Sequence, residues 1–324
     1  MLILIWEKRA MKKLKILLFT FLVMFFGISS VYALNVPKDH LVSPHWVYSH
    51  MHNKNLVIVD VRVPKAYASG HIPGSVNIPF PSIMQNYIGI KILGNIASPE
   101  KMTGIYRRAG ITNHSIIVFT GGGISKFPLG YSNETRALWT GWFYGLTKMA
   151  ILNGGLARWM KDKLPVTTKP SHPVASNFTI MKMRLRSRAT YQRIWKYLYI
   201  HNVVLIDARP VAWFKGLDHD PRFIKHGHIP GAINVPFTEF EKMSKAGYYE
   251  FVTPAEARAI LVKAGVSFRK PIITQCNTGY WASADWFVIK FLLHKNNVAD
   301  YNGSWVQYSR IPNAPIVDLH IHKY

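Results

Sequence analysis

The sequence predicts an α/β protein made of two copies of one domain, each with a mostly parallel central sheet and helices on both faces. The stretch LVIVDVRVPKAYASGHIPGSVNIPF (residues 56–80) recurs as VVLIDARPVAWFKGLDHDPRFIKHGHIPGAINVPF (residues 203–237), and such repetition marks a repeated structural unit. Apolar runs alternate with helical stretches in both copies, which is the pattern of parallel sheets covered by helices. The 324 residues, 49% hydrophobic and 13% aromatic, provide for two cores.

The N-terminus has the features of an export signal. Residues 1–33 end in MKKLKILLFTFLVMFFGISSVYA, with a basic start, a short apolar run and small residues at its end. This pattern predicts a secretory signal peptide, residues 1–33, that is cleaved after Ala33, and hence a periplasmic or secreted protein. Two alternatives stay open, which are an uncleaved anchor and a translation start at Met11 instead of Met1.

The chain is strongly basic. Its formal net charge is +24, and removal of the leader leaves about +20. In an exported protein this charge favours small anions as ligands and weak association with an anionic membrane surface, and it does not favour nucleic acid as a partner. A solvated basic surface is the alternative interpretation.

Each copy repeats the same short motifs in the same order. An apolar strand leads to Asp-x-Arg, at Asp60–Arg62 and at Asp207–Arg209, and Gly-His-Ile-Pro-Gly follows at residues 70–74 and 227–231. Between these motifs the second copy is longer, in a region that contains GLDHDPRFIK. Arg209 directly follows a strand, so it points toward the carboxyl end of the sheet, where α/β proteins bind ligands.

Helices are predicted after these motifs in both copies. SPEKMTGIYRRAGI (residues 98–111) and TPAEARAILVKAGV (residues 253–266) begin with Ser or Thr followed by Pro and an acidic residue, and they end near a glycine. The apolar strands SIIVFT and PIITQ follow, and then a further helix in each copy. RALWTGWFYGL (residues 136–146) has the apolar spacing of a helix that covers a sheet.

The two copies are separated by a segment without periodicity. LPVTTKPSHPVASN (residues 164–177) is rich in Pro, Ser and Thr, which is typical of a linker. We therefore predict domains at residues 34–165 and 180–318, a linker at 166–179 and a tail at 319–324.

The only cysteine, Cys276, lies in TQCNTGYWASADW between an apolar strand and a helix. At this place it faces backbone N–H groups and the positive end of the helix dipole, which favour thiolate over thiol. Gly279 allows the loop to curl into a cradle for a thiolate, a persulfide or an oxyanion. Alignment of the copies places Gly121 opposite Cys276, so the first copy has no nucleophile. A buried cysteine that only packs is the alternative.

These motifs, together with YNGSW at residues 301–305, resemble the two-domain rhodanese sulfurtransferases over residues 40–317. The resemblance implies tandem rhodanese domains, an inactive one followed by a catalytic one. It also implies that Cys276 takes a sulfane sulfur from thiosulfate or 3-mercaptopyruvate and passes it to cyanide or a thiol. No metal and no cofactor is implied.

The resemblance assigns roles to individual residues. Cys276 is the expected nucleophile, Arg209 binds substrate and Asp207 supports the site. The persulfide is expected to be bound by the loop residues Asn277, Thr278, Gly279, Tyr280 and Trp281.

Two departures from the family pattern concern the sulfur donor. Members that prefer thiosulfate have basic residues directly after the cysteine, and those that prefer 3-mercaptopyruvate have small ones, whereas Asn277 and Thr278 are neither. Trp213 stands where many members have a further arginine. The donor stays open, with a preference for thiosulfate because the chain is basic and exported.

Functions other than sulfur transfer fit the sequence less well. A persulfide carrier, sensor or scaffold without turnover is the main alternative, because a fold does not fix a function. The related phosphatases need an arginine to grip phosphate, and Ala282 stands at that position. The pairs His50/His52 and His320/His322 have no Cys or acidic cluster beside them, so surface histidines are favoured over a metal site.

Overall fold

The computed structural model describes residues 34–87, 92–124, 130–218 and 223–319. The predicted leader, residues 1–33, and the pair His320/His322 lie outside these ranges. The described residues from Val36 onward belong to one compact unit that contains both copies of the repeat. No helix in the described ranges is both long enough and apolar enough to span a membrane.

Each copy contains a five-stranded sheet in which neighbouring strands are parallel. The first has the order β1-β7-β6-β2-β3, and the second has the matching order β8-β14-β13-β9-β10. The strands of the first sheet are β1 (Leu41–Val42), β2 (Leu56–Asp60), β3 (Val76–Asn77), β6 (Ile116–Thr120) and β7 (Met149–Leu152). Those of the second are β8 (Arg188–Ala189), β9 (Val204–Asp207), β10 (Ile233–Asn234), β13 (Ile272–Gln275) and β14 (Val298–Tyr301). The predicted fold class is confirmed.

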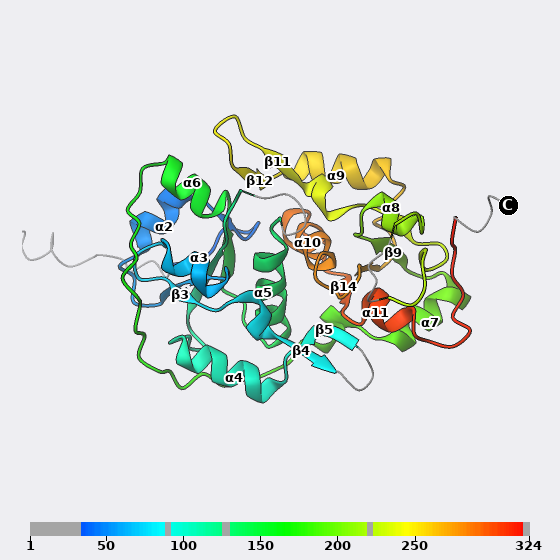
Figure 1. The fold of residues 1–324 in the computed structure, drawn as a ribbon, viewed down its shortest axis with the longest axis horizontal. Coiled ribbons are helices and arrows are strands. Elements are labelled where there is room, and N and C mark those ends of the chain that lie inside the picture. Colours follow the sequence, from blue (N-terminus) through cyan, green and yellow to red (C-terminus); the bar gives the residue numbers. More distant parts are fainter. Residues whose placement is uncertain (1–33, 88–91, 125–129, 219–222, 320–324) are drawn as a thin grey trace, which may run out of the picture. The chain divides into compact units, whose positions relative to one another are not determined.

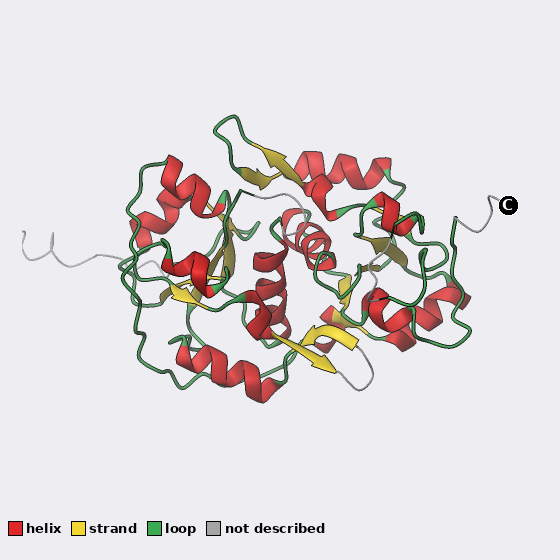
Figure 2. Ribbon diagram, in the orientation of Figure 1, coloured by secondary structure: helices red, strands yellow, loops and turns green. Residues whose placement is uncertain are grey.

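Helices surround the sheets in both copies (Figures 1 and 2). The first copy has α2 (Pro44–His50), α3 (Pro64–Ala68), η1 (Phe80–Ile83), α4 (Pro99–Arg108), α5 (Ser132–Phe143) and α6 (Gly155–Lys161). The second has η3 (Leu185–Ser187), α7 (Tyr191–Ile200), α8 (Val211–Phe214), η4 (Phe237–Phe240), α9 (Pro254–Lys263), α10 (Ala282–Phe287), the π-helical turn η5 (Val288–Leu292) and α11 (Ser304–Tyr308). The caps predicted for α4 and α9 are present, since Ser98 Oγ accepts from Lys101 and Thr253 forms a capping box with Glu256.

The helices α5 and α10 join the two copies. They lie side by side in the middle of Figure 1, and the hydroxyls of Thr135 and Ser283 are hydrogen bonded across them at 2.9 Å. All six residues of α10 are buried. The helix packs against α5, so one apolar core, with Trp139 and Trp286 among its members, extends through both copies.

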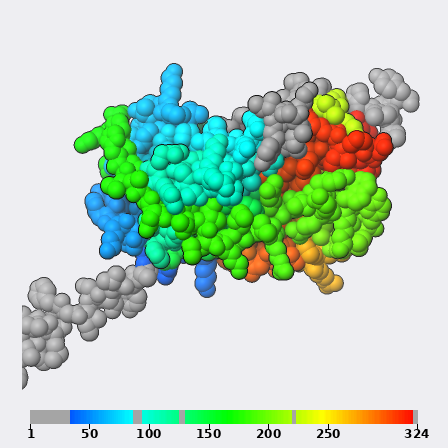
Figure 3. All heavy atoms as spheres, turned by 90° about the horizontal axis from the view of Figure 1, so that it is seen from below, coloured from blue at the N-terminus to red at the C-terminus, as the bar shows by residue number. Residues whose placement is uncertain are grey.

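Two antiparallel hairpins, which the sequence analysis did not predict, cross between the copies. They are β4 (Met84–Tyr87) with β5 (Ile92–Ile96), and β11 (Glu241–Met243) with β12 (Tyr249–Phe251). Ile96 N donates to Asn302 Oδ1 at 3.0 Å, and Phe251 N donates to Asn153 Oδ1 at 2.9 Å. The cyan β4–β5 segment accordingly lies beside red C-terminal residues in Figure 3. The hairpin of the first copy therefore contacts the Asn302-Gly303 turn of the second, and the hairpin of the second contacts the Asn153-Gly154 turn of the first.

Candidate active site

Cys276 lies directly after β13, at the carboxyl edge of the second sheet, and its side chain is fully buried. The last residue of β13, Gln275, pairs with Asp207 of β9, just as Thr120 of the first sheet pairs with Asp60. The backbone N–H groups of Thr278 and Ala282 donate hydrogen bonds to the Cys276 thiol. Ala282, the first residue of α10, was not among the predicted site residues, although its place at a helix N-terminus could have indicated it.

Every carbonyl group of the loop from Cys276 to Trp281 accepts a hydrogen bond. Since N–H and C=O of a trans peptide point in opposite directions, a donor on each carbonyl fixes the direction of the next amide. The carbonyls of Cys276 and Asn277 accept from Trp305 N and Val306 N, both at 2.9 Å. Those of Thr278 and Gly279 accept from Asn302 Nδ2 at 3.5 Å and from Arg136 Nη1 at 2.7 Å. Those of Tyr280 and Trp281 accept from Ser283 Oγ at 2.7 Å and from Ala284 N at 2.9 Å.

Burial raises the pKa of the Cys276 thiol above its usual range. The N–H groups of Ala282 and Thr278 lower that pKa, and the carboxylates of Asp300 and Asp207 raise it further. The prediction that the helix end and the loop amides favour the thiolate is right for the amides but wrong for the net direction. Desolvation outweighs them, because the thiol packs in an apolar cluster that includes Phe237 and Trp281.

Aromatic rings form one wall of this region. The ring of Trp213 lies 5.4 Å from that of Trp281, which stacks on Phe237 at 5.2 Å. The Tyr280 ring lies 4.4 Å from that of Phe80 of the first copy, in a tilted arrangement, and its hydroxyl donates to Asn133 Oδ1. Trp213, the residue noted in the sequence as a departure from the expected arginine, thus contributes an aromatic ring.

The predicted pair Asp207 and Arg209 lies at the same edge of the sheet as Cys276. Arg209 is 2% exposed and donates to both carboxylate oxygens of Asp207 and to the Gly227 carbonyl. Arg62 makes the same contacts with Asp60 and Gly70 in the copy without cysteine. These contacts therefore tie each Asp-x-Arg segment to its Gly-His-Ile-Pro-Gly turn, and substrate binding by Arg209 stays a prediction.

Arg136, on α5 of the first copy, reaches the cysteine loop of the second copy. Its side chain is fully buried; Nη1 donates to Gly279 O at 2.7 Å and Nη2 donates to Gly94 O at 3.0 Å. Nη1 also lies 3.7 Å from Asp300 Oδ2. The apolar spacing of residues 136–146 indicated a core helix and did not point to Arg136 as a site residue. The available signal was an arginine in an apolar helix, because a buried charge needs a partner.

The matching position of the first copy is filled by a carboxyl group. A Cβ atom at Gly121 would lie 2.2 Å from Glu134 Oε1, and the Gly121 N–H donates to the same carboxyl group. Glu241 of the second copy accepts from Tyr131 N at 2.8 Å nearby. The loop of the first copy thus packs against buried carboxyl groups, and a side chain at position 121 has no space.

Glu134→Gln is expected to stabilise the protein at alkaline pH. Burial raises the pKa of Glu134 to about 8, so between the ordinary value of 4.5 and about 8 the folded chain holds a proton that the unfolded chain has lost. The unfolding free energy therefore falls as pH rises through this window. The glutamine variant, which stays neutral, should gain roughly 3 kcal/mol over the original chain near pH 8 and lose little near pH 5.

Chemical denaturation at several pH values measures this difference. Glu239→Gln, at an exposed position, is the matched control and should leave the pH dependence unchanged. An equal gain for Glu134→Gln near pH 5 and near pH 8 would contradict the assignment.

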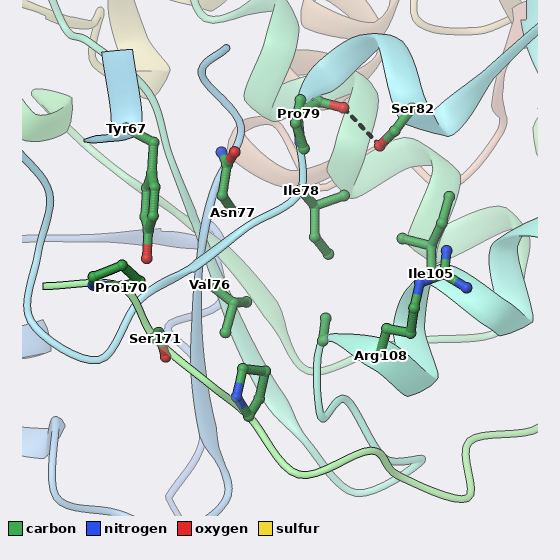
Figure 4. Close-up of a pocket in the computed structure, with 12 residues that line it drawn as sticks. Tyr67, Val76, Asn77, Ile78, Pro79, Ser82, Ile105, Arg108, Pro170 and Ser171 are labelled. Carbon is green, nitrogen blue, oxygen red and sulfur yellow. Dashed lines mark hydrogen bonds between the residues drawn. The ribbon is translucent and has the colours of Figure 1, made fainter. Parts of the chain in front are cut away.

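A pocket away from the cysteine lies between the first copy and residues of the predicted linker (Figure 4). It has a volume of about 360 Å³ and includes Tyr67, Asn77 and Arg108 from the first copy and Pro170 and Ser171 from the linker. None of its lining residues belongs to the loop from Cys276 to Trp281.

A wider cleft, of about 1160 Å³, is lined by Trp142 and Trp286 and by six basic residues. Trp142 lies in it, with the Arg184 guanidinium 4.2 Å and the Lys290 ammonium 5.0 Å from its rings. No Asp or Glu is among its lining residues, and the basic ones are Lys182, Arg184, Arg186, Arg188, Arg193 and Lys290. Such a surface attracts anions.

In the part of the chain that the structure describes, no group of three or more His, Cys, Asp or Glu side chains is arranged to hold a metal ion. His50, one of the paired histidines noted in the sequence, forms a hydrogen bond with the Trp46 carbonyl and packs near the Trp46 ring.

Comparison with known proteins identifies the family. The rhodanese-like domain matches residues 43–162 and again residues 190–311. The chain is 31% identical over 289 residues to a Synechococcus elongatus protein named "Putative thiosulfate sulfurtransferase", covering 85% of this chain and 84% of the relative. It is 26% identical to the "Sulfur carrier protein TtuD" of Thermus thermophilus, covering 85% and 95%.

The fold is also that of a solved relative. The crystal structure of SseA from Escherichia coli, described as a 3-mercaptopyruvate sulfotransferase, superposes with a TM-score of 0.71 at 27% identity, over 82% of this chain and 98% of SseA. Both copies of the repeat match the family, and the two sheets have the same strand order as each other. The chain belongs to the rhodanese family, with two rhodanese-like domains in tandem.

Proposed function

We propose that this protein is an exported sulfurtransferase that moves a sulfane sulfur from thiosulfate, through a persulfide on Cys276, to cyanide or a thiol acceptor. The observation that carries the proposal is the position of the only cysteine, at the carboxyl edge of the second sheet with two backbone amides donating to its thiol. The names of the relatives, which include sulfur transfer from thiosulfate, support the reaction class.

The chemistry has two steps. The Cys276 thiolate attacks the outer sulfur of thiosulfate; the new Cys–S bond forms as the sulfur–sulfur bond of thiosulfate breaks, and sulfite leaves with the electron pair. Cyanide then attacks the outer sulfur of the persulfide, releases thiocyanate and returns the thiolate. The negative charge stays near the inward amides throughout, so the loop from Asn277 to Trp281 stabilises both forms of the enzyme. The chemistry requires no metal and no organic cofactor.

Thiosulfate is preferred over 3-mercaptopyruvate as donor because the charge of the protein suits a small dianion. The formal net charge of the chain is +24, and Arg136 places a cation at the loop that follows Cys276. Weak association with an anionic membrane surface follows from the same charge, and no nucleic-acid partner is proposed. Export is inferred from the basic and apolar pattern of residues 11–33.

Sulfite and pyruvate release distinguish the two donors. The protein from residue 34 onward, supplied with thiosulfate and cyanide, is expected to form thiocyanate and sulfite in equal amounts, several-fold faster than it forms thiocyanate and pyruvate from 3-mercaptopyruvate. Faster turnover with 3-mercaptopyruvate would reverse the donor assignment. Expression of the full chain tests export, because the mature protein should begin at Leu34; an intact N-terminus would contradict cleavage.

A persulfide carrier is the second candidate, and the full burial of Cys276 favours it, since a buried persulfide is protected from small nucleophiles. A carrier would release about one sulfite per protein molecule from thiosulfate and stop, even with excess cyanide. Continued release would exclude this candidate.

A further inference from the structure

We propose that Arg136, which belongs to the domain without a cysteine, is a positioning residue for the reaction: it fixes the Cys276 loop in its sulfur-binding form and places a positive charge beside the sulfur anion. The proposal rests on the proposed function only in taking Cys276 as the reactive group. It makes the two domains a single catalytic unit.

The guanidinium connects the loop to the hairpin of the first domain. One terminal nitrogen donates to Gly279 O and the other to Gly94 O, at 2.7 and 3.0 Å. Gly94 packs so closely on the loop that a Cβ atom there would lie 2.9 Å from Thr278 Cβ. Arg136 therefore fixes the distance between strand β5 and the cysteine loop.

The Gly279 carbonyl depends on this contact. The other five carbonyls of the loop are bound by groups of the second domain, whereas Gly279 O is bound by Arg136 of the first. Gly279 has φ +73°, in the left-handed region that glycine adopts without steric cost. Loss of the donor would leave a buried carbonyl without a partner, which favours rotation of the peptide and hence of the Tyr280 amide.

The charges around the thiol give Arg136 a second role. Asp207 on β9 and Asp300 on β14 are carboxyl groups that raise the pKa of Cys276. The guanidinium of Arg209 is bonded to Asp207, while that of Arg136 lies beside Asp300. Burial lowers the pKa of Arg136, and the charges of Asp300 and Cys276 raise it. Burial raises the pKa of Asp300 to about 7, while Arg136 and, to a smaller extent, Arg188 lower it. Above that pH Arg136 offsets the Asp300 carboxylate and thereby favours the Cys276 anion.

Other titratable groups near the thiol do not replace this charge. Asp285 on α10 has a pKa well above its ordinary value because it is buried and close to Asp207 and Asp300. The pKa of Tyr280, in the loop itself, is raised well above its ordinary value, mainly by burial. Both are acids, so neither can supply the positive charge that Arg136 places near the thiol.

The other domain has the opposite arrangement. Its loop, which has no nucleophile, packs against the carboxyl groups of Glu134 and Glu241. The proposed role requires a guanidinium beside the loop that carries the sulfur anion. The loop without a nucleophile has carboxyl groups beside it instead.

The alkylation rate of Cys276 tests the proposal without any sulfur donor. Because the chain has one cysteine, iodoacetamide reports on this thiol alone in the original chain, Arg136→Met and Arg136→Lys, from about pH 6 to about pH 10. Arg184→Met is the matched control, since Arg184 lies over Trp142 and donates to the Trp142 and Leu146 carbonyls. Thermal unfolding verifies that each variant is folded.

The methionine variant is expected to have its alkylation midpoint about one pH unit higher, and roughly tenfold slower alkylation at a fixed pH below the midpoint. Arg184→Met should alkylate like the original chain. A folded Arg136→Met with an unchanged midpoint would overturn the proposal, as would an equal shift in the control.

The lysine variant decides the matter if the methionine variant does not fold. Lysine keeps the charge but cannot form the planar two-pronged contact to both carbonyls. We expect a midpoint close to that of the original chain together with sulfur transfer reduced several-fold. If Arg136→Lys matches the original chain in both measurements, the positioning role is wrong.

Discussion

Replacing Cys276 with serine is expected to abolish sulfur transfer and leave the fold unchanged. A serine hydroxyl is not ionised near neutral pH and cannot hold a labile sulfur, so the rate should fall by about three orders of magnitude or more. The substitution should cost little packing, because serine is close to cysteine in size and Cys276 N keeps its bond to Ser304 Oγ. Thiocyanate formation from thiosulfate and cyanide measures the loss.

Intact mass provides the control for this variant. After incubation with thiosulfate alone, the original chain should gain the mass of one sulfur atom, and Cys276→Ser should gain none. Thermal unfolding of the two proteins should agree closely. Residual turnover in a folded Cys276→Ser protein would mean that the reaction does not proceed through this residue.

Gly279→Ala should reduce sulfur transfer by roughly a hundredfold, because small displacements at a catalytic loop are costly. Gly279 has φ +73°, which alanine rarely adopts. A Cβ atom here would lie 2.8 Å from Asn302 Cα and 3.0 Å from Arg136 Nη1. The backbone of Asn302 cannot move without moving β14, so the loop and the guanidinium must shift. Steady-state sulfur transfer and the alkylation rate of Cys276 both measure the effect.

Gly247→Ala is the matched control for Gly279→Ala. Gly247 has a similar φ of +85°, and a Cβ atom added there would have no neighbouring atom within 4 Å. This variant carries the same backbone strain, about 1 kcal/mol, without the steric conflict. It should be slightly less stable and fully active. Equal losses of activity in the two variants would show that strain, and not the position of the loop, is responsible.

The fold could be predicted from the sequence because its determinants are local. The Asp-x-Arg segments at Asp60 and Asp207 mark the ends of matching strands, and the caps at Ser98 and Thr253 mark the starts of matching helices. Such signals depend on residues a few positions apart. They can therefore be recognised in the sequence by comparing one copy with the other.

The site could be predicted only in part, because some of its surroundings come from the other domain. Arg136 and the β5 hairpin meet the loop only after the domains pack together, and no spacing in the sequence indicates that contact. The pKa of Cys276 was also predicted in the wrong direction, for a different reason. The amides that lower it are local to the loop, while the desolvation that raises it is a property of the whole core.

The exchange of hairpins also sets the order in which the protein can assemble. Ile96 and Asn302, which join the first hairpin to the second Asn-Gly turn, are 206 residues apart, and Arg136 and Gly279 are 143 residues apart. Contacts with such large sequence separation form late and slow the folding of a chain. The first domain emerges earlier in synthesis and can fold before the cysteine is made. The thiol consequently acquires its final environment in the last stage of folding, when the two domains dock.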